Sequence, residues 1–306
     1  MEYFTHAAIG HAVGSLYPGE GPAYHAAYTS TMIVSVAPDM INFVWRRAIG
    51  RKHFEPPTHT LPGALAITLA ASAIGVAFFP GAAFWPTFGF SLLGMGAHFL
   101  TDFMNTHGTR GLWPLVAKRF RWDLLWPADP VLALCCLLPA LLTGYTERPA
   151  AYLLGLVFAA AWITLRIPLR AACLRAVRNA AAPGATDVAV LPGAGNLNRW
   201  TYIITYPDRY AMGVVRCFPR AVGAPEAYLR LETAPAAASK HHPKTAAFLA
   251  WSRFPWARVE ERPDGYMVTW TDLQFSFLGR MPLKVAVLVQ LDTALKPTNV
   301  TEEEAD

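Results

Sequence analysis

The chain has 306 residues, of which 54% are hydrophobic and only 15% are charged. An average soluble domain carries about 25% charged residues, and a disordered chain combines low hydrophobicity with high charge. The composition therefore excludes a disordered protein and argues against a single ordinary soluble domain. A mean hydropathy of +0.27 favours a membrane protein, whereas the pI near 9.1 is also typical of nucleic-acid binding.

Charged residues are absent from long stretches of the first half of the chain. No Asp, Glu, Lys or Arg lies between Glu55 and Asp102, which leaves room for two helices of the ~20 residues that a bilayer crossing needs. Pro80 and Gly81 mark the turn between them. A large soluble helical core is the weaker alternative, because its helices need a charged face. Together with shorter charge-free gaps, the pattern predicts six membrane segments at residues 3–18, 23–43, 60–79, 86–106, 129–145 and 150–168.

Basic residues alternate between the predicted loops. They follow segments two, four and six, where the last group begins at Arg166, whereas the other loops hold only Arg148. The positive-inside rule then places both termini in the cytoplasm of a multi-pass inner-membrane protein. Because topology explains the basic pI, we expect no nucleic-acid partner. Residues 1–20 lack a basic start and contain His6 and His11, so no cleavable signal peptide is expected.

Composition changes near Ala180. Residues 180–184 are typical of a linker, and residues 244–256 are compatible with a helix. Runs rich in aromatic and β-branched residues predict β-strands at 200–206, 266–270 and 283–291. We therefore expect a mainly α protein: a polytopic helical membrane domain over residues 1–179, followed by a small soluble α+β domain over residues 185–306 on the cytoplasmic side.

Ionisable side chains inside membrane segments are costly and usually functional. Five of them, distant in sequence, fall near the predicted cytoplasmic face: His6, Asp39, His59, His98 and Asp102. The predicted membrane topology is derived from Lys and Arg alone. The common location of these five His and Asp residues is therefore an independent check of that topology. His98 and Asp102 are four residues apart and share one helix face. Imidazole and carboxylate suit Zn²⁺, with Mn²⁺ or Fe²⁺ as alternatives, so we predict a site for one or two divalent ions.

Other polar residues of this region receive different interpretations. His11 and His25 are expected to be structural, and His107 is a lesser candidate for an outer ligand or substrate contact. Asp129 is a candidate either for a group that hydrogen-bonds to a metal ligand and orients it or for a further ligand. The basic patch at residues 240–244 is expected to be a solvated loop.

Four short motifs, in this order, resemble the YdjM-like family of inner-membrane proteins: Thr5-His6, Ala37-Pro38-Asp39, Thr58-His59-Thr60 and Gly96-Ala-His98-Phe-Leu-Thr-Asp102. That family is described as LexA-regulated, predicted metal-dependent hydrolases, and the resemblance covers about residues 1–145. The sequence departs from the family pattern at Ile41, where the family has a second Asp, and around His53, where an Arg-Gly pair is missing. The resemblance implies a metal-dependent hydrolase.

The residues and the resemblance together predict hydrolysis at the cytoplasmic face by a metal-activated water. Asp39 or Asp102 would be the general base, and Arg110 would pair with an anionic group such as a phosphate. The expected substrate is a membrane lipid or a small phosphate ester.

Two other classes of function use similar residues. A metal or proton transporter also carries intramembrane His and Asp, although its binding site belongs near the bilayer midplane. A non-catalytic membrane scaffold would enclose a structural metal in a closed coordination sphere, and its soluble domain would bind an unknown protein partner.

Overall fold

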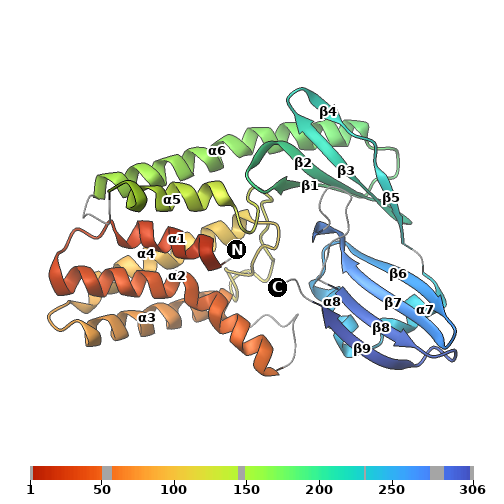
Figure 1. Ribbon diagram of the computed structural model, residues 1–306, viewed down its shortest axis with the longest axis horizontal. Helices are drawn as coiled ribbons and strands as arrows, with labels where there is room; N and C mark the ends of the chain where they lie inside the picture. The colour runs from red at the N-terminus through yellow and green to blue at the C-terminus, as the bar shows by residue number, and fades with distance from the viewer. Residues whose placement is uncertain (1–2, 50–56, 144–148, 231, 276–285, 304–306) are drawn as a thin grey trace. The chain divides into compact units, whose positions relative to one another are not determined.

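The computed structural model of the chain describes residues 3–49, 57–143, 149–230, 232–275 and 286–303 (Figure 1). A helical region comes first, followed by a region of two β-sheets. The helices are α1 (Tyr3–Gly14), α2 (Gly21–Ile49), α3 (Leu61–Phe78), α4 (Phe84–Met104), α5 (Pro130–Thr143) and α6 (Pro149–Ala180), with a short 3₁₀ helix η1 (Pro57–His59) before α3. Each predicted membrane segment thus contains a helix.

Within the described ranges, two helices, α3 and α6, are long and apolar enough to cross a membrane. α5 contains a shorter apolar stretch, and the 12 residues of α1 span about 18 Å, less than a hydrocarbon core of about 30 Å. α2 and α4 are long enough, but Asp39, His98 and Asp102 lower their hydropathy. The six-segment topology therefore stays a prediction.

α6 continues well beyond the predicted end of the sixth segment at residue 168. Arg166, which we count among the basic loop residues after segment six although it falls within 150–168, lies inside this helix and is fully buried. Its Nε donates to the Leu124 carbonyl, and its Nη1 lies 3.8 Å from Asp129 Oδ2. A buried guanidinium needs such partners, so the expectation of a loop position for Arg166 is corrected.

Small residues allow α1, α2 and α4 to approach closely. A Cβ atom on Gly10 of α1 would overlap the side chain of Ser35 on α2. A Cβ atom on Gly94 of α4 would lie 2.7 Å from Thr31 Cγ2, also on α2. Close backbone approach at small residues is typical of helix packing in membranes. It brings the polar side chains of these three helices within reach of one another.

The second region contains a five-stranded and a four-stranded sheet. In the first, β1 (Asp187–Gly193), β2 (Asn196–Thr205), β3 (Arg209–Cys217) and β4 (Arg220–Val222) are neighbours in that order, and β5 (Glu226–Leu229) pairs with β3. The second is an antiparallel series of β6 (Pro255–Arg262), β7 (Gly265–Asp272), β8 (Ala286–Leu291) and β9 (Pro297–Glu303). The helices α7 (Ala234–Ser239) and α8 (Pro243–Trp251) pack on it through Phe248, Val268 and Trp270, and η2 (Leu273–Phe275) follows β7.

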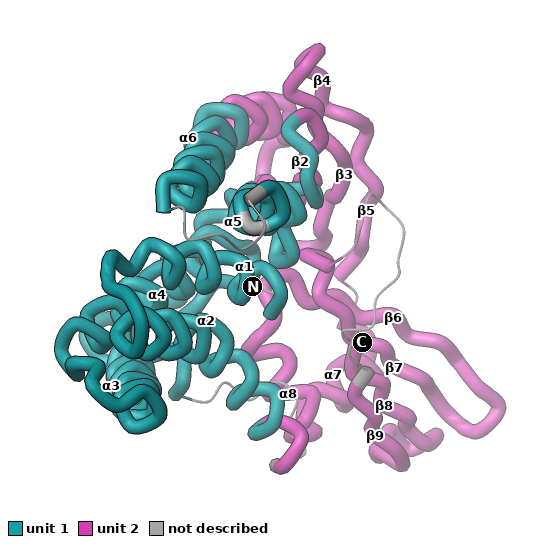
Figure 2. Tube along the Cα trace, turned by 60° about the vertical axis from the view of Figure 1, so that its left-hand side comes forward, with its two compact units in different colours: residues 1–45, 55–170, 192–197 teal, residues 46–54, 171–191, 198–306 magenta. Residues whose placement is uncertain are grey.

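The predicted strands at 200–206 and 266–270 fall on β2 and β7, whereas residues 283–285 of the third lie outside the described residues. The helix predicted over 244–256 ends at Trp251, because Pro255 already starts strand β6. Contacts divide the chain into two compact units (Figure 2), and the division falls inside α6 after Arg170 rather than at the predicted linker.

Replacing Gly94 by alanine is expected to destabilise the helical unit by about 1–3 kcal/mol, because the added methyl group would overlap Thr31 in a tightly packed interface. Gly96→Ala is the matched control on the same helix, since its Cβ would meet no atom within 4 Å. Alanine also favours a helix over glycine by about 1 kcal/mol. Thermal unfolding of the purified protein in detergent measures both variants. Equal melting temperatures would contradict the packing argument.

Candidate metal centre

The structure brings the five predicted ligands together from four elements. They are His6 on α1, Asp39 on α2, His59 on η1, and His98 and Asp102 on α4. Four of the five are buried, and Asp39 is partly buried with 12% of its side chain exposed. The close packing of α1, α2 and α4 thus brings the side chains of His6, Asp39, His98 and Asp102 together.

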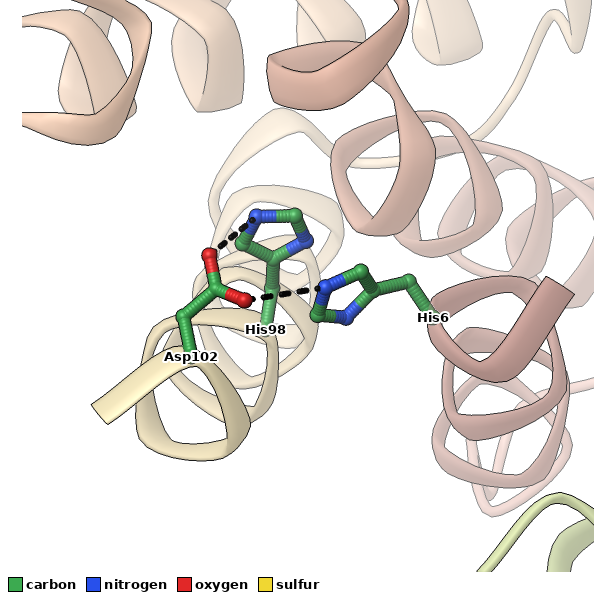
Figure 3. Close-up of side chains that lie close together, drawn as sticks. All are labelled: His6, His98 and Asp102. Carbon is green, nitrogen blue, oxygen red and sulfur yellow. Dashed lines mark ion pairs between the residues drawn. The ribbon is translucent and has the colours of Figure 1, made fainter. Parts of the chain in front are cut away.

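Asp102 faces all three imidazoles. Its Oδ1 lies 3.3 Å from His6 Nε2, and its Oδ2 lies 3.4 Å from His59 Nε2 and 3.5 Å from His98 Nε2. Figure 3 shows the rings of His6 and His98 next to each other, each facing one oxygen of the Asp102 carboxylate, and the two rings stack with centroids 3.8 Å apart. Three Nε2 atoms therefore point toward one place.

Asp39 closes the cluster from α2. Its Oδ1 lies 3.0 Å from His59 Nε2, and its Oδ2 lies 3.5 Å from His6 Nε2. Among the described residues, neither Asp39 Oδ2 nor either ring nitrogen of His6 has a hydrogen-bond partner. Buried polar atoms without partners are rare in folded proteins, and a cation between His6 and the carboxylates would satisfy them.

The separations of the donor atoms fit a metal ion. In a tetrahedral site with bonds of about 2.1 Å, neighbouring donor atoms lie about 3.4 Å apart. Two groups of three residues have ligand atoms within 4.8 Å of one another: His6, His98 and Asp102, and Asp39, His59 and His98. Because both groups contain His98, the residues fit one ion or two adjacent ions. Imidazole and carboxylate donors suit Zn²⁺, Mn²⁺ and Fe²⁺.

Hydrogen bonds outside the cluster orient two of the imidazoles. His98 Nδ1 lies 2.9 Å from the Ser35 carbonyl oxygen, which can only accept a hydrogen bond. The Nδ1 atom therefore carries the hydrogen, and Nε2 of the neutral ring presents its lone pair to the cluster. His59 Nδ1 lies 3.1 Å from Thr58 Oγ1, a hydroxyl that donates or accepts and so allows either tautomer.

Pro38 shapes α2 next to the cluster. Pro38 lies inside α2 and has no N–H group, so it cannot donate to the Val34 carbonyl four residues earlier. Ser35 lies in the turn between these two residues and offers its carbonyl to His98, while Asp39 follows directly after Pro38. This part of α2 therefore contributes the Ser35 carbonyl, which contacts His98, and the Asp39 carboxylate, which contacts His59.

Asn105 fixes the Asp102 carboxylate. Its Nδ2 donates to Asp102 Oδ1 at 3.0 Å, and its own Oδ1 accepts from the Gly108 backbone at 2.7 Å. Sequence reasoning gave no role to Asn105, Thr58 or Ser35. The i, i+3 spacing of Asp102 and Asn105 is a usable signal, whereas Ser35 acts through its backbone and leaves no signal in the sequence.

The remaining candidates lie in different surroundings. Arg110 is exposed, and its neighbour Thr109 donates from Oγ1 to the His59 carbonyl. The carbonyl of His107 accepts from Arg121 Nε, and burial lowers the pKa of the His107 ring to about 3. Asp129 Oδ1 accepts from the Val131 and Leu132 backbones, which gives this residue the role of N-cap of α5.

The two histidines expected to be structural have aromatic neighbours. His11 Nδ1 lies 2.8 Å from the Tyr28 hydroxyl, and the ring of His25 stacks on Phe79. In the second region, His242 is the N-cap of α8. His53 lies outside the described residues.

The comparisons with known proteins agree with this combination of a helical region and an α/β region. Residues 1–172 match the YdjM inner membrane protein family, and the chain therefore belongs to this family. Residues 235–301 match the YfhP C-terminal alpha/beta plait domain. The chain is also 23% identical over 308 residues to the "Uncharacterized protein YfhP" of Bacillus subtilis (strain 168), covering 97% of this chain and 93% of that protein. No solved structure matches the chain.

Replacing Asn105 by alanine is expected to weaken Zn²⁺ binding by about 10–100-fold, the usual effect of losing a group that orients a ligand. Competition with a chromogenic chelator measures the affinity. Asn299→Ala, at an exposed position on β9, is the control and should bind as wild type. Unchanged affinity of Asn105→Ala would show that Asp102 needs no such support.

Proposed function

We propose that the chain is a metal-dependent hydrolase of the bacterial inner membrane, acting at the cytoplasmic face. One observation carries the proposal: three imidazole Nε2 atoms and two carboxylates, from four elements, meet in a mainly apolar bundle. Placing so many ionisable groups together is costly unless they bind a cation or take part in chemistry. Zn²⁺ is the proposed ion, with Mn²⁺ or Fe²⁺ as alternatives.

The residues suit different roles. His6, His59, His98 and Asp102 would hold the metal, which when bound lowers the pKa of a coordinated water towards about 7 and polarises the bond to be cleaved. Asp102 is surrounded by three imidazoles and Asn105 and is therefore best suited to ligation. Asp39 is the most exposed of the cluster and keeps Oδ2 free of hydrogen bonds, so it is placed to accept a proton as general base.

The proposed substrate is a phosphate ester, either a membrane lipid or a small molecule. Arg110 lies in the loop after α4, next to the residue that contacts His59, and its guanidinium would pair with the phosphate. The six-segment topology with both termini in the cytoplasm belongs to this proposal, because it puts the cluster within reach of lipid headgroups. The basic loops support it.

One observation favours the alternative of a scaffold with a structural metal. His6, His98 and Asp102 are almost completely buried, as ligands of a closed structural site are. The 12% exposure of the Asp39 side chain gives water access to the cluster, which a hydrolase requires. Activity measurements on metal-loaded protein therefore discriminate between the two.

Elemental analysis of purified protein tests the metal itself. His98→Ala and Asp102→Ala should each lower the bound metal per chain, because each removes a donor from the cluster. His25→Ala, which removes an imidazole stacked on Phe79, should retain the wild-type content. The same metal content in all three variants would refute the site.

Replacing Asp39 by asparagine tests the role of general base. The variant should retain most of the metal but lose about 10²–10⁴-fold in turnover, because the amide cannot accept the proton. Hydrolysis of a phospholipid in mixed micelles and of a chromogenic phosphodiester, with and without Zn²⁺ or Mn²⁺, measures the rate. Full activity in Asp39→Asn would contradict the assignment, and a metal-loaded wild type inactive on both substrates would favour the scaffold.

A further inference from the structure

A groove with an almost entirely apolar lining runs between α5 and α6. Its volume of about 560 Å³ lies within the ~300–1,000 Å³ usual for ligand pockets. Leu134, Leu138 and Leu142 form one wall, and Leu154 and Phe158 form the other. Figures 1 and 2 both show the two helices side by side. The groove contains none of the proposed metal ligands, so it is a separate feature of the helical unit.

The walls of the groove are suited to hydrocarbon rather than water. Leu142 is 76% exposed, Leu154 54% and Phe158 57%. A contiguous apolar surface of this kind marks an interaction site. The chain belongs to an inner-membrane family, and α6 is one of its two candidate membrane spans among the described residues. The acyl chains of the bilayer are therefore the apolar material available to fill the groove.

The groove changes character at one end. Trp162, the last aromatic residue of its lining on α6, is followed at four-residue spacing by Arg166 and Arg170 on the same helix face. The side chain of Arg166 is buried, whereas that of Arg170 is 23% exposed and lies 3.1 Å from Asp123. Arg166 faces Asp129, whereas Arg170 uses Nη2 for Asp123 and keeps Nε without a hydrogen-bond partner among the described residues. Along α6 the apolar groove thus leads to a partly exposed guanidinium with a donor to spare, the same order of groups as in a lipid with an anionic headgroup.

We propose that this groove binds one acyl chain of an anionic phospholipid, with the lipid phosphate at the Arg170 end. The site goes beyond the hydrolase function and does not require it, since binding here involves neither the metal ligands nor a reaction. The occupant is a resident or regulatory lipid rather than a peptide, because the lining is almost entirely hydrocarbon and offers a peptide backbone only the Trp162 indole N–H and the Cys135 thiol.

Adjacent residues provide matched variants. Ala161 lines the groove, whereas Ala160 is exposed and does not. Ala161→Trp fills the groove, and Ala160→Trp adds the same side chain beside it. Cys135 lines the groove and Cys136 is fully buried, so the reactivity of Cys135 reports occupancy without an introduced label.

The experiment measures alkylation of Cys135 by N-ethylmaleimide, followed by mass spectrometry, in the full-length protein in maltoside detergent. Dioleoylphosphatidylglycerol should slow the reaction about fivefold once the lipid concentration is several times its Kd, because protection follows occupancy. Ala160→Trp should behave as wild type, and Ala161→Trp should lose the lipid effect. Arg170→Gln should lose the preference for phosphatidylglycerol over phosphatidylcholine, whereas Arg175→Gln, at an exposed position outside the groove, should keep it.

Several results would overturn the proposal. Lipid protection that persists in Ala161→Trp would place the lipid elsewhere, and equal protection by phosphatidylcholine in wild type would remove the headgroup assignment. A dimer that dissociates in Ala161→Trp would identify a second copy as the occupant. Metal content measured on the same samples keeps the two proposals separate, because Ala161→Trp should retain the wild-type metal content even if the lipid site fails.

Discussion

Imidazoles and carboxylates in an apolar bundle are stable only if they face one another or share a cation, because neither water nor hydrocarbon compensates them there. This requirement explains much of the helical unit. Asp102 meets the Nε2 atoms of three histidines, and Asn105 donates to Oδ1, the oxygen that also faces His6. The backbones of α1, α2 and α4 must approach closely for these contacts to form, which is why Gly10 and Gly94 stand where they do. The close packing of the helices is thus a condition for the geometry of the cluster.

The sequence predicts the helices well where their signal is a run without charge, as in α3 and α4. It predicts the convergence of His98 with Asp102, because four-residue spacing fixes a common face. The sequence does not predict contacts that depend on tertiary packing. The contact of the Ser35 carbonyl with His98 has no sequence signature, and Arg166 is assigned to a loop because its burial beside Asp129 is visible only in the structure. The division of the second region into two sheets likewise depends on strand pairing, which local composition does not encode.

α6 combines several roles in one element. Its first half is apolar and forms a wall of the groove with α5, and its middle carries the buried Arg166, which binds the loop that follows α4. That loop returns to α4, since the Leu124 and Leu125 backbones donate to the carbonyl of Met104. Membership of the YdjM inner membrane protein family covers this helix up to residue 172. The same contacts therefore link α6, a candidate membrane span, to the helix that bears His98 and Asp102.

The ligands of the cluster are spread from His6 to Asp102, and no single helix supplies more than two of them. These residues can come together to hold an ion only after the first four helices have been synthesised and packed. An ion captured there would add its binding free energy to the folded state alone. Metal supply would then control how much of the newly made protein survives proteolysis in the membrane, so the cell's metal status would set its abundance independently of any catalytic turnover.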